Sequence, residues 1–180
     1  MFKLWSDRVT TCRRNMVYLR YAEALNRAGF PQSAVVVLKC GLCDENNQAF
    51  IDDTERQLAG SLISFDPTVF TKGSTIGIHA LGSGDTQCDT LFRAPLPATQ
   101  LATRQDTVDY QIPLVEDMII TEMALEGSFE GYRYYDLLRV ALRRNDPAYL
   151  ADAVSRRMGQ SDAALRGLLM NKENWYLPLP

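Results

Sequence analysis

The sequence predicts a mainly α protein that contains helical hairpins, a long irregular loop segment and a minor amount of β structure. Three observations carry this prediction. Apolar residues recur at helical spacing toward both ends of the chain, glycine and proline mark sharp helix ends, and the periodicity disappears over 66–112. The 180 residues are 46% hydrophobic and 23% charged, which is enough apolar material for a core. We expect a single unit over 1–180.

A helical hairpin is expected over 14–43. Its first helix, 16–28, carries one apolar face, formed by Val17, Tyr21, Ala24, Leu25 and Ala28. Gly29 can adopt the left-handed conformation that ends a helix, and Pro31 suits the first turn of the next one. The second helix places four apolar residues on one face, Ala34, Val35, Leu38 and Leu42, and ends at Gly41. Residues 35–37 alone are also typical of a strand, but the tight turn favours a hairpin of the tetratricopeptide-like kind.

Residues 51–65 predict a shorter helix that begins with a capping box. Asp52 would cap it, Glu55 would reach back, and Leu58 and Leu62 lie four apart. Glycines and prolines then interrupt 66–112 repeatedly, which indicates a loop-rich excursion with a short strand at 91–94.

Residues 113–170 are expected to be helical again. One apolar stripe runs from Pro113 onward and continues across Gly131, in two helices or in one bent helix, through Leu114, Met118, Leu125, Phe129, Tyr135, Leu138 and Leu142. Asp146 and Pro147 start another helix, whose apolar face ends at Gly159 and contains Leu150, Val154 and Met158. Ser161 would cap a last helix with Leu165, Leu168 and Leu169, and residues 174–180 should be extended.

Composition excludes several classes of partner. The 19 basic and 22 acidic residues give a net charge of −3, whereas nucleic-acid binding needs a positive field. No apolar run reaches the roughly 20 residues of a membrane-spanning helix. The four cysteines, Cys12, Cys40, Cys43 and Cys88, are too few and too scattered for a fold held by disulfides. Cys40 and Cys43 have the spacing of a zinc or redox pair, but only the distant Cys88 and the single His79 could complete a site. We therefore expect no metal and no cofactor.

Two further motifs resemble sites of known chemistry. Glu122, Glu126 and Glu130 would stack on one helix face, whereas the paired carboxylates of glycosidases come from different elements. The loop at 82–85 lacks the strand and helix that a phosphate-binding loop requires. With one histidine, no Ser-His-Asp or Cys-His arrangement can be built, so we expect a protein that is not an enzyme. Two aromatic clusters are each interpreted either as packing or as contact with a ligand: Tyr132, Tyr134 and Tyr135 in the middle of the helical region, and Trp175 and Tyr176 near the end of the sequence.

Four segments occur in an order that resembles a known family. Residues 18–29 resemble a helix of pattern R-x-A-E-A-x-N-x-x-G, residues 77–85 a glycine-rich loop, and residues 175–180 a Y-x-x-P-I-P close. The most specific segment, 122–139, resembles E-L-A-F-E-G-x-R-W-x-D-L-x-R. Together they resemble the C-terminal part of the SusD/RagB family of outer-membrane nutrient-binding lipoproteins.

The resemblance implies non-catalytic capture of oligosaccharides on the outward face of the outer membrane, for import through a TonB-dependent (SusC-like) barrel. It implies that this chain is mainly the helical scaffold, because the glycan-contacting aromatic residues of characterised family members mostly lie earlier than the segments matched here, so the resemblance assigns no ligand-binding residues. It also implies membrane association only through a lipid anchor, and a partial chain, because no export signal is visible here. We interpret the family signature as structural, with a buried arginine among carboxylates joining two helices: Glu126, Glu130, Arg133, Asp136 and Arg139. The alternative is a tetratricopeptide-like protein–protein interaction module.

Overall fold

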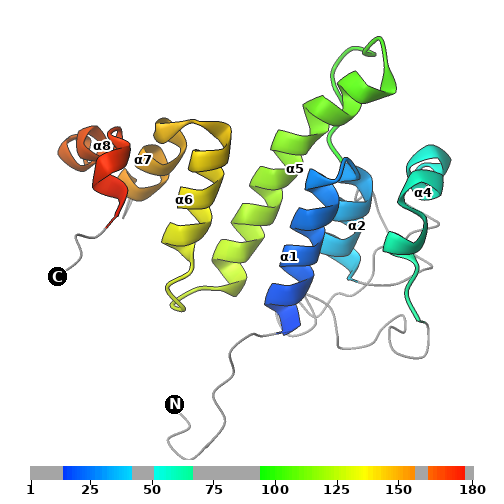
Figure 1. The fold of residues 1–180 in the computed structure, drawn as a ribbon, viewed down its shortest axis with the longest axis horizontal. Coiled ribbons are helices and arrows are strands. Elements are labelled where there is room, and N and C mark those ends of the chain that lie inside the picture. Colours follow the sequence, from blue (N-terminus) through cyan, green and yellow to red (C-terminus); the bar gives the residue numbers. More distant parts are fainter. Residues whose placement is uncertain (1–13, 42–50, 67–93, 157–161, 177–180) are drawn as a thin grey trace, which may run out of the picture. The chain divides into compact units, whose positions relative to one another are not determined.

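Helices make up the regular structure of the protein in a computed structural model that describes residues 14–41, 51–66, 94–156 and 162–176 (Figure 1). No strand occurs in these four ranges, which confirms the mainly α prediction. The expected strand at 91–94 lies outside them except for Ala94, which is not in a strand. Contacts divide the chain into two compact units, Met1–Glu126 and Gly127–Pro180, and the single unit over 1–180 stays a prediction.

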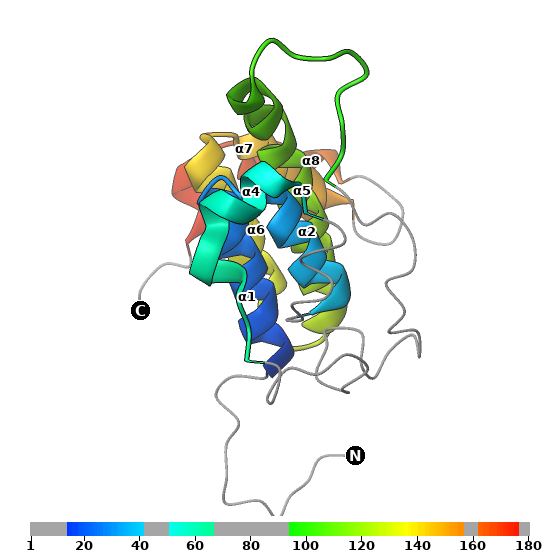
Figure 2. The same cartoon turned by 90° about the vertical axis from the view of Figure 1, so that its right-hand side faces the viewer.

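The first unit is built around three packed helices. These are α1 (Arg14–Arg27), α2 (Pro31–Cys40) and α5 (Arg104–Glu126), each of which contacts the other two (Figures 1 and 2). The short α4 (Asp53–Ala59) packs on α2 and continues into the 3-10 helix η1 (Gly60–Ile63). Within the described ranges, no helix combines the length and hydrophobicity needed to cross a membrane.

The α1–α2 turn confirms the predicted hairpin. Gly29 has a φ of +90°, and the amide of Phe30 donates to the Leu25 carbonyl at 3.0 Å while the Gly29 amide donates to that of Asn26 at 3.1 Å. This pair of bonds satisfies carbonyls that the helix end leaves open. Pro31 begins α2, and Gly41 ends it with a 3.0 Å bond to Val37. Residues 35–37 are helical, so the strand alternative is wrong.

The buried face of α1 differs from the predicted one. Val17 is 51% exposed, and Ala24 and Ala28 are also exposed. Of the predicted stripe only Leu25 is fully buried, and the buried residues instead include Met16, Tyr18, Leu19, Ala22, Glu23 and Asn26. Because α1 packs on both α2 and α5, its buried arc is wider than a single apolar stripe and is turned away from the predicted one.

The start of α4 uses only half of the expected capping box. Asp52 caps the helix by accepting the Glu55 amide at 2.7 Å. The Glu55 side chain is buried and turns toward α2, where its Oε1 accepts both the Ser33 amide at 2.7 Å and the Ser33 hydroxyl at 2.8 Å. Leu58 and Leu62 are exposed, so α4 is attached to α2 through this polar contact more than through its leucines.

Helix α5 begins at Arg104, inside the segment predicted to be irregular, and runs through Pro113. Its start has a reciprocal cap: the Asp106 amide donates to the Thr103 hydroxyl at 3.1 Å, and the Thr103 amide to the Asp106 carboxylate at 3.0 Å. Buried residues precede and follow the proline, and this packing offsets the backbone hydrogen bond that a proline removes. They are Val108, Gln111, Val115, Glu116, Ile119, Ile120 and Met123.

The predicted stripe on α5 is wrong for the same packing reason. Leu114 is 36% exposed, Leu125 is 66% exposed and Phe129 is fully exposed with a φ of +66°. The helix ends at Glu126, and Gly131 has a φ of +80°, so the stretch forms two helices and not one bent helix.

The second unit contains α6 (Arg133–Arg144), α7 (Pro147–Ser155), α8 (Ala163–Leu169) and the 3-10 helix η3 (Lys172–Trp175), which pack on one another in chain order. Asn145 takes the left-handed conformation, and the Asp146 amide donates to the Ala141 carbonyl at 3.0 Å. Asp146 then caps α7 through the Ala148 amide at 3.0 Å, with Pro147 in the first turn, as predicted.

Other predictions for this unit need correction. The cap of α8 is Asp162, which accepts the Leu165 amide at 3.0 Å; Ser161, Met158 and Gly159 lie outside the described residues. On α6 the predicted stripe is wrong: Tyr135 and Leu142 are exposed, and the buried residues are Asp136, Leu137, Val140 and Ala141.

Residues 174–175 are not extended as predicted. They belong to η3, because the Asn171 side chain caps this turn through the Glu173 amide at 3.1 Å and the Trp175 ring is buried.

Candidate ligand-binding site

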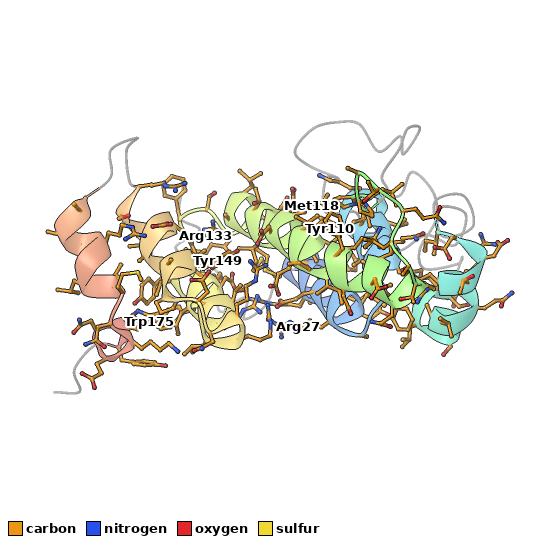
Figure 3. The ribbon with its side chains drawn as sticks, turned by 90° about the horizontal axis from the view of Figure 1, so that it is seen from above. Arg27, Tyr110, Met118, Arg133, Tyr149 and Trp175 are labelled. Atoms are coloured by element: carbon orange, nitrogen blue, oxygen red, sulfur yellow. The ribbon has the colours of Figure 1, made fainter. Side chains whose placement is uncertain are left out.

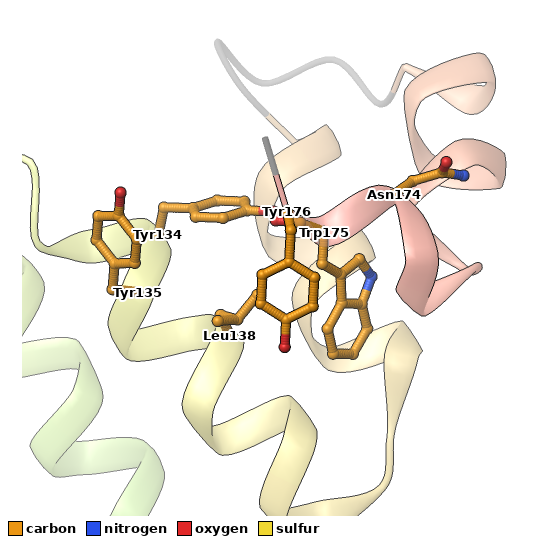
Figure 4. Close-up of a pocket in the computed structure, with 6 residues that line it drawn as sticks. All are labelled: Tyr134, Tyr135, Leu138, Asn174, Trp175 and Tyr176. Carbon is orange, nitrogen blue, oxygen red and sulfur yellow. Dashed lines mark hydrogen bonds between the residues drawn. The ribbon is translucent and has the colours of Figure 1, made fainter. Parts of the chain in front are cut away.

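A pocket lined mainly by aromatic side chains lies between α6 and the end of the described chain. Its volume is about 510 Å³, within the ~300–1,000 Å³ of typical small-molecule sites. Helix α6 contributes one side and the η3 segment the other, so that residues about forty positions apart meet (Figure 4). The lining residues are Tyr134, Tyr135, Leu138, Asn174, Trp175 and Tyr176.

Two of the aromatic residues hold the pocket together. The Tyr134 hydroxyl donates to the Trp175 carbonyl at 2.8 Å, which ties the chain end to α6. The Trp175 ring is 3% exposed, and its Nε1 donates to the Leu169 carbonyl at 2.6 Å, which ties η3 to α8. Burial, with smaller effects of Tyr135 and Tyr176, raises the pKa of Tyr134 above its usual 10.0. The Tyr134 hydroxyl therefore stays protonated at neutral pH.

The other two aromatic residues are open to solvent. Tyr135 is 64% exposed and Tyr176 is 60% exposed, although both line the pocket. Tyr135 meets the edge of Tyr134 at a ring-centre distance of 6.0 Å and an angle of 82°. In Figure 4 Tyr134 reaches from α6 toward Trp175 and Tyr176, whereas the Asn174 side chain points away from the rings. These two exposed tyrosines offer flat faces that no internal packing occupies fully.

The family-signature residues take different positions from those predicted. Asp136 is buried, and its Oδ1 lies 3.1 Å from the Nε of Arg139, so these two signature residues form an ion pair on α6. Arg133, at the start of α6, is exposed, and the prediction of a buried arginine there is wrong. Arg133 is the first residue of α6, whereas the buried residues of this helix begin at Asp136.

The predicted row of three glutamates does not form on one helix. Glu122 and Glu126 lie in the last turns of α5, but the helix ends at Glu126 and Glu130 follows in the turn. Glu126 accepts a hydrogen bond from the Asn15 amide group at 3.1 Å, which links α5 to α1.

The segment 18–29, which resembles the family helix, has a structural role in the first unit. Glu23 is 4% exposed and pairs with Arg20 at 3.3 Å and with Arg27. Asn26 is fully buried, and its Nδ2 donates to the Ile112 carbonyl of α5 at 2.9 Å. The Glu23 pairs lie within α1, whereas the Asn26 bond links α1 to α5 and satisfies a buried amide donor that would be costly to leave without a partner.

The metal and phosphate candidates cannot be placed. Cys12, Cys43, Cys88, His79 and the loop at 82–85 lie outside the described residues. Among the residues that are described, no group of three or more metal-binding side chains occurs.

Sequence reasoning named most of the aromatic lining but could not assemble it. The two clusters were noticed separately, each with packing and ligand contact as open interpretations, and Tyr132 proves not to line the pocket. Asn174 was missed entirely. Leu138 follows Tyr134 by one helical turn, a spacing that could have revealed their common face.

Comparison of the chain with protein-family models, curated proteins and solved structures finds no match. The SusD/RagB resemblance therefore stays a prediction that rests on the four sequence segments.

Proposed function

We propose that this protein captures oligosaccharides without catalysing a reaction on them, and that its first unit acts mainly as a helical scaffold. The observation that carries the proposal is the pocket of the second unit, where the exposed Tyr135 and Tyr176 lie beside the buried Trp175 and the half-buried Tyr134. The C–H groups on one face of a sugar ring pack against the electron-rich face of an aromatic ring, while the sugar hydroxyls remain available for hydrogen bonds.

The sequence resemblance gives this binding a biological setting. We propose capture at the outward face of the outer membrane and delivery to a TonB-dependent barrel. The order of the four family-like segments supports this part of the proposal, and co-purification of a barrel protein with this protein from its native membrane would test it.

The alternative, a tetratricopeptide-like protein-binding module, has less support from the geometry. Such modules bind peptides on the free faces of stacked helical hairpins. In this chain, the side chains from Ser33 to Leu38 are all buried, so α2 offers little free surface to a peptide.

A glycan array probed with the 180-residue chain tests the function. We expect retention of a subset of oligosaccharides, lost when Tyr135→Ala and Tyr176→Ala are combined. The matched control is Tyr110→Ala, which removes a tyrosine on α5 that is 41% exposed (Figure 3). An array on which the unaltered chain retains neither neutral nor acidic glycans would contradict the proposed function.

A further inference from the structure

We infer that the pocket binds a neutral oligosaccharide, with sugar rings stacked on Tyr135 and Tyr176, and that it rejects acidic sugars. The inference rests on the proposed function, since it names the class of sugar that the same pocket selects.

Differences in exposure and hydrogen bonding among the four aromatic residues identify the rings on which a sugar can stack. Trp175 is buried and its N–H is used by the Leu169 carbonyl, while Tyr134 uses its hydroxyl proton on the Trp175 carbonyl. The buried Trp175 therefore has little surface left for a ligand, and the half-buried Tyr134 has already used its hydroxyl proton within the protein. Tyr135 and Tyr176 line the same pocket while more than half of each side chain faces solvent. A ligand that enters would cover these two rings.

Charge in and beside the pocket favours a neutral ligand. None of the six lining residues carries a charge. On the neighbouring turn of α6, Asp136 and Arg139 pair with each other at 3.1 Å, so each already has a partner of opposite charge. A carboxylate or sulfate that leaves water for such a site would find no cation in the lining, and burying an unpaired charge is strongly unfavourable.

The polar groups that remain suit sugar hydroxyls. The phenol groups of Tyr135 and Tyr176 can each donate and accept a hydrogen bond, as sugar hydroxyls do. Asn174 offers less, because its amide nitrogen donates to the Leu168 carbonyl at 2.9 Å. Since burial keeps the pKa of Tyr134 above its ordinary value, the wall that it forms stays uncharged at neutral pH. The pocket thus combines flat apolar faces with neutral hydroxyls.

Calorimetric titration of the full chain tests the inference with two matched sets of probes. The neutral set is maltohexaose, cellohexaose, xylohexaose and mannohexaose, and the acidic set is oligogalacturonate and a heparin hexasaccharide. The variants are Tyr135→Ala, Tyr176→Ala and the corresponding Phe substitutions. Tyr132→Ala is the control, because Tyr132 is 43% exposed in the same unit but does not line the pocket. Circular dichroism of each variant verifies that it is folded.

We expect at least one neutral probe to bind, with affinity lowered roughly tenfold by either Ala substitution, about threefold or less by Phe, and not at all by the control. The acidic probes should bind at least tenfold more weakly than the neutral one. Acidic probes that bind as tightly as neutral ones would overturn the inference and leave the proposed function standing. Neutral binding that is unaffected by both Ala variants would also overturn it. Failure of every probe would instead count against the proposed function itself.

Discussion

Replacement of Glu55 by alanine should destabilise the first unit strongly, because this buried carboxylate joins α4 to α2. Its Oε1 accepts two hydrogen bonds from Ser33, at 2.7 Å from the amide and 2.8 Å from the hydroxyl, and Ser33 itself is fully buried. Each such bond to a charged acceptor contributes about 1.5–3 kcal/mol. The burial of the Oε2 atom of Glu55 reduces this stabilisation, because Oε2 has no hydrogen-bond partner. The nearby charge of Arg104, whose Nη2 lies 3.8 Å from Oε2, offsets part of that cost.

The net loss expected for Glu55→Ala is therefore about 2–4 kcal/mol in the free energy of unfolding. Urea titration followed by circular dichroism measures it. Asp53→Ala on the same helix is the control, because the Asp53 side chain is 85% exposed and its contact with Arg56 should contribute less than about 1 kcal/mol. A loss below about 1 kcal/mol for Glu55→Ala would refute the role assigned to this carboxylate.

The same residue should also make stability depend on pH. Burial raises the pKa of Glu55 above its ordinary 4.5, although hydrogen bonds from Ser33 oppose the shift. The folded state thus holds the proton more tightly than the unfolded chain does. The stability that the protonated Glu55 contributes is complete at a pH below its pKa in the unfolded chain, and it is lost as the pH rises through the higher pKa of the folded state. Stability measured against pH should therefore fall over this window for the unaltered chain relative to Glu55→Gln. If the difference in unfolding free energy between the unaltered chain and Glu55→Gln stayed constant with pH, the raised pKa of Glu55 would be contradicted.

Three further changes are predicted. Gly29→Ala should lower the free energy of unfolding by about 1–2 kcal/mol, because a φ of +90° disfavours any side chain, even though no atom lies near the new methyl group. Gly167→Ala, inside α8, is the control and should be neutral or stabilising. Thermal denaturation compares the two variants. Tyr134→Phe should lower the free energy of unfolding by about 1 kcal/mol and weaken glycan binding, because the Trp175 carbonyl loses its 2.8 Å hydrogen bond from the Tyr134 hydroxyl. An unchanged glycan affinity in calorimetric titration would show that this hydrogen bond does not support the pocket. A double-mutant cycle of Asn15→Ala and Glu126→Ala should give a coupling of about 0.5–1.5 kcal/mol, and a zero coupling would show that the 3.1 Å contact contributes nothing.

Helix ends were easier to predict from the sequence than helix faces. Gly29, Asp52 and Asp146 each act through a local hydrogen-bond pattern or backbone angle, so a few neighbouring residues were sufficient. The start of α5 was missed because Thr103 and Asp106 form a cap without the Glu or Gln that marks the usual pattern, and because Pro113 suggested a beginning.

Helix faces depend on tertiary partners that the sequence does not name. The predicted faces of α1 and α5 assumed one apolar stripe each, and both helices have more than one packing partner. Polar residues such as Asn26 and Glu55 also occupy the core, where their bonds to α5 and α2 are possible only after folding. The pocket could not be predicted for the same reason: it forms only after folding brings Tyr134 to Trp175, about forty residues further along the sequence.

The measurement that addresses the central claim most directly is NMR of the chain mixed with a neutral oligosaccharide that it binds. The account predicts intermolecular Overhauser effects between sugar C–H protons and the ring protons of Tyr135 and Tyr176, two exposed walls of the aromatic pocket. Overhauser effects confined to the first unit, for example to Tyr110, would contradict it.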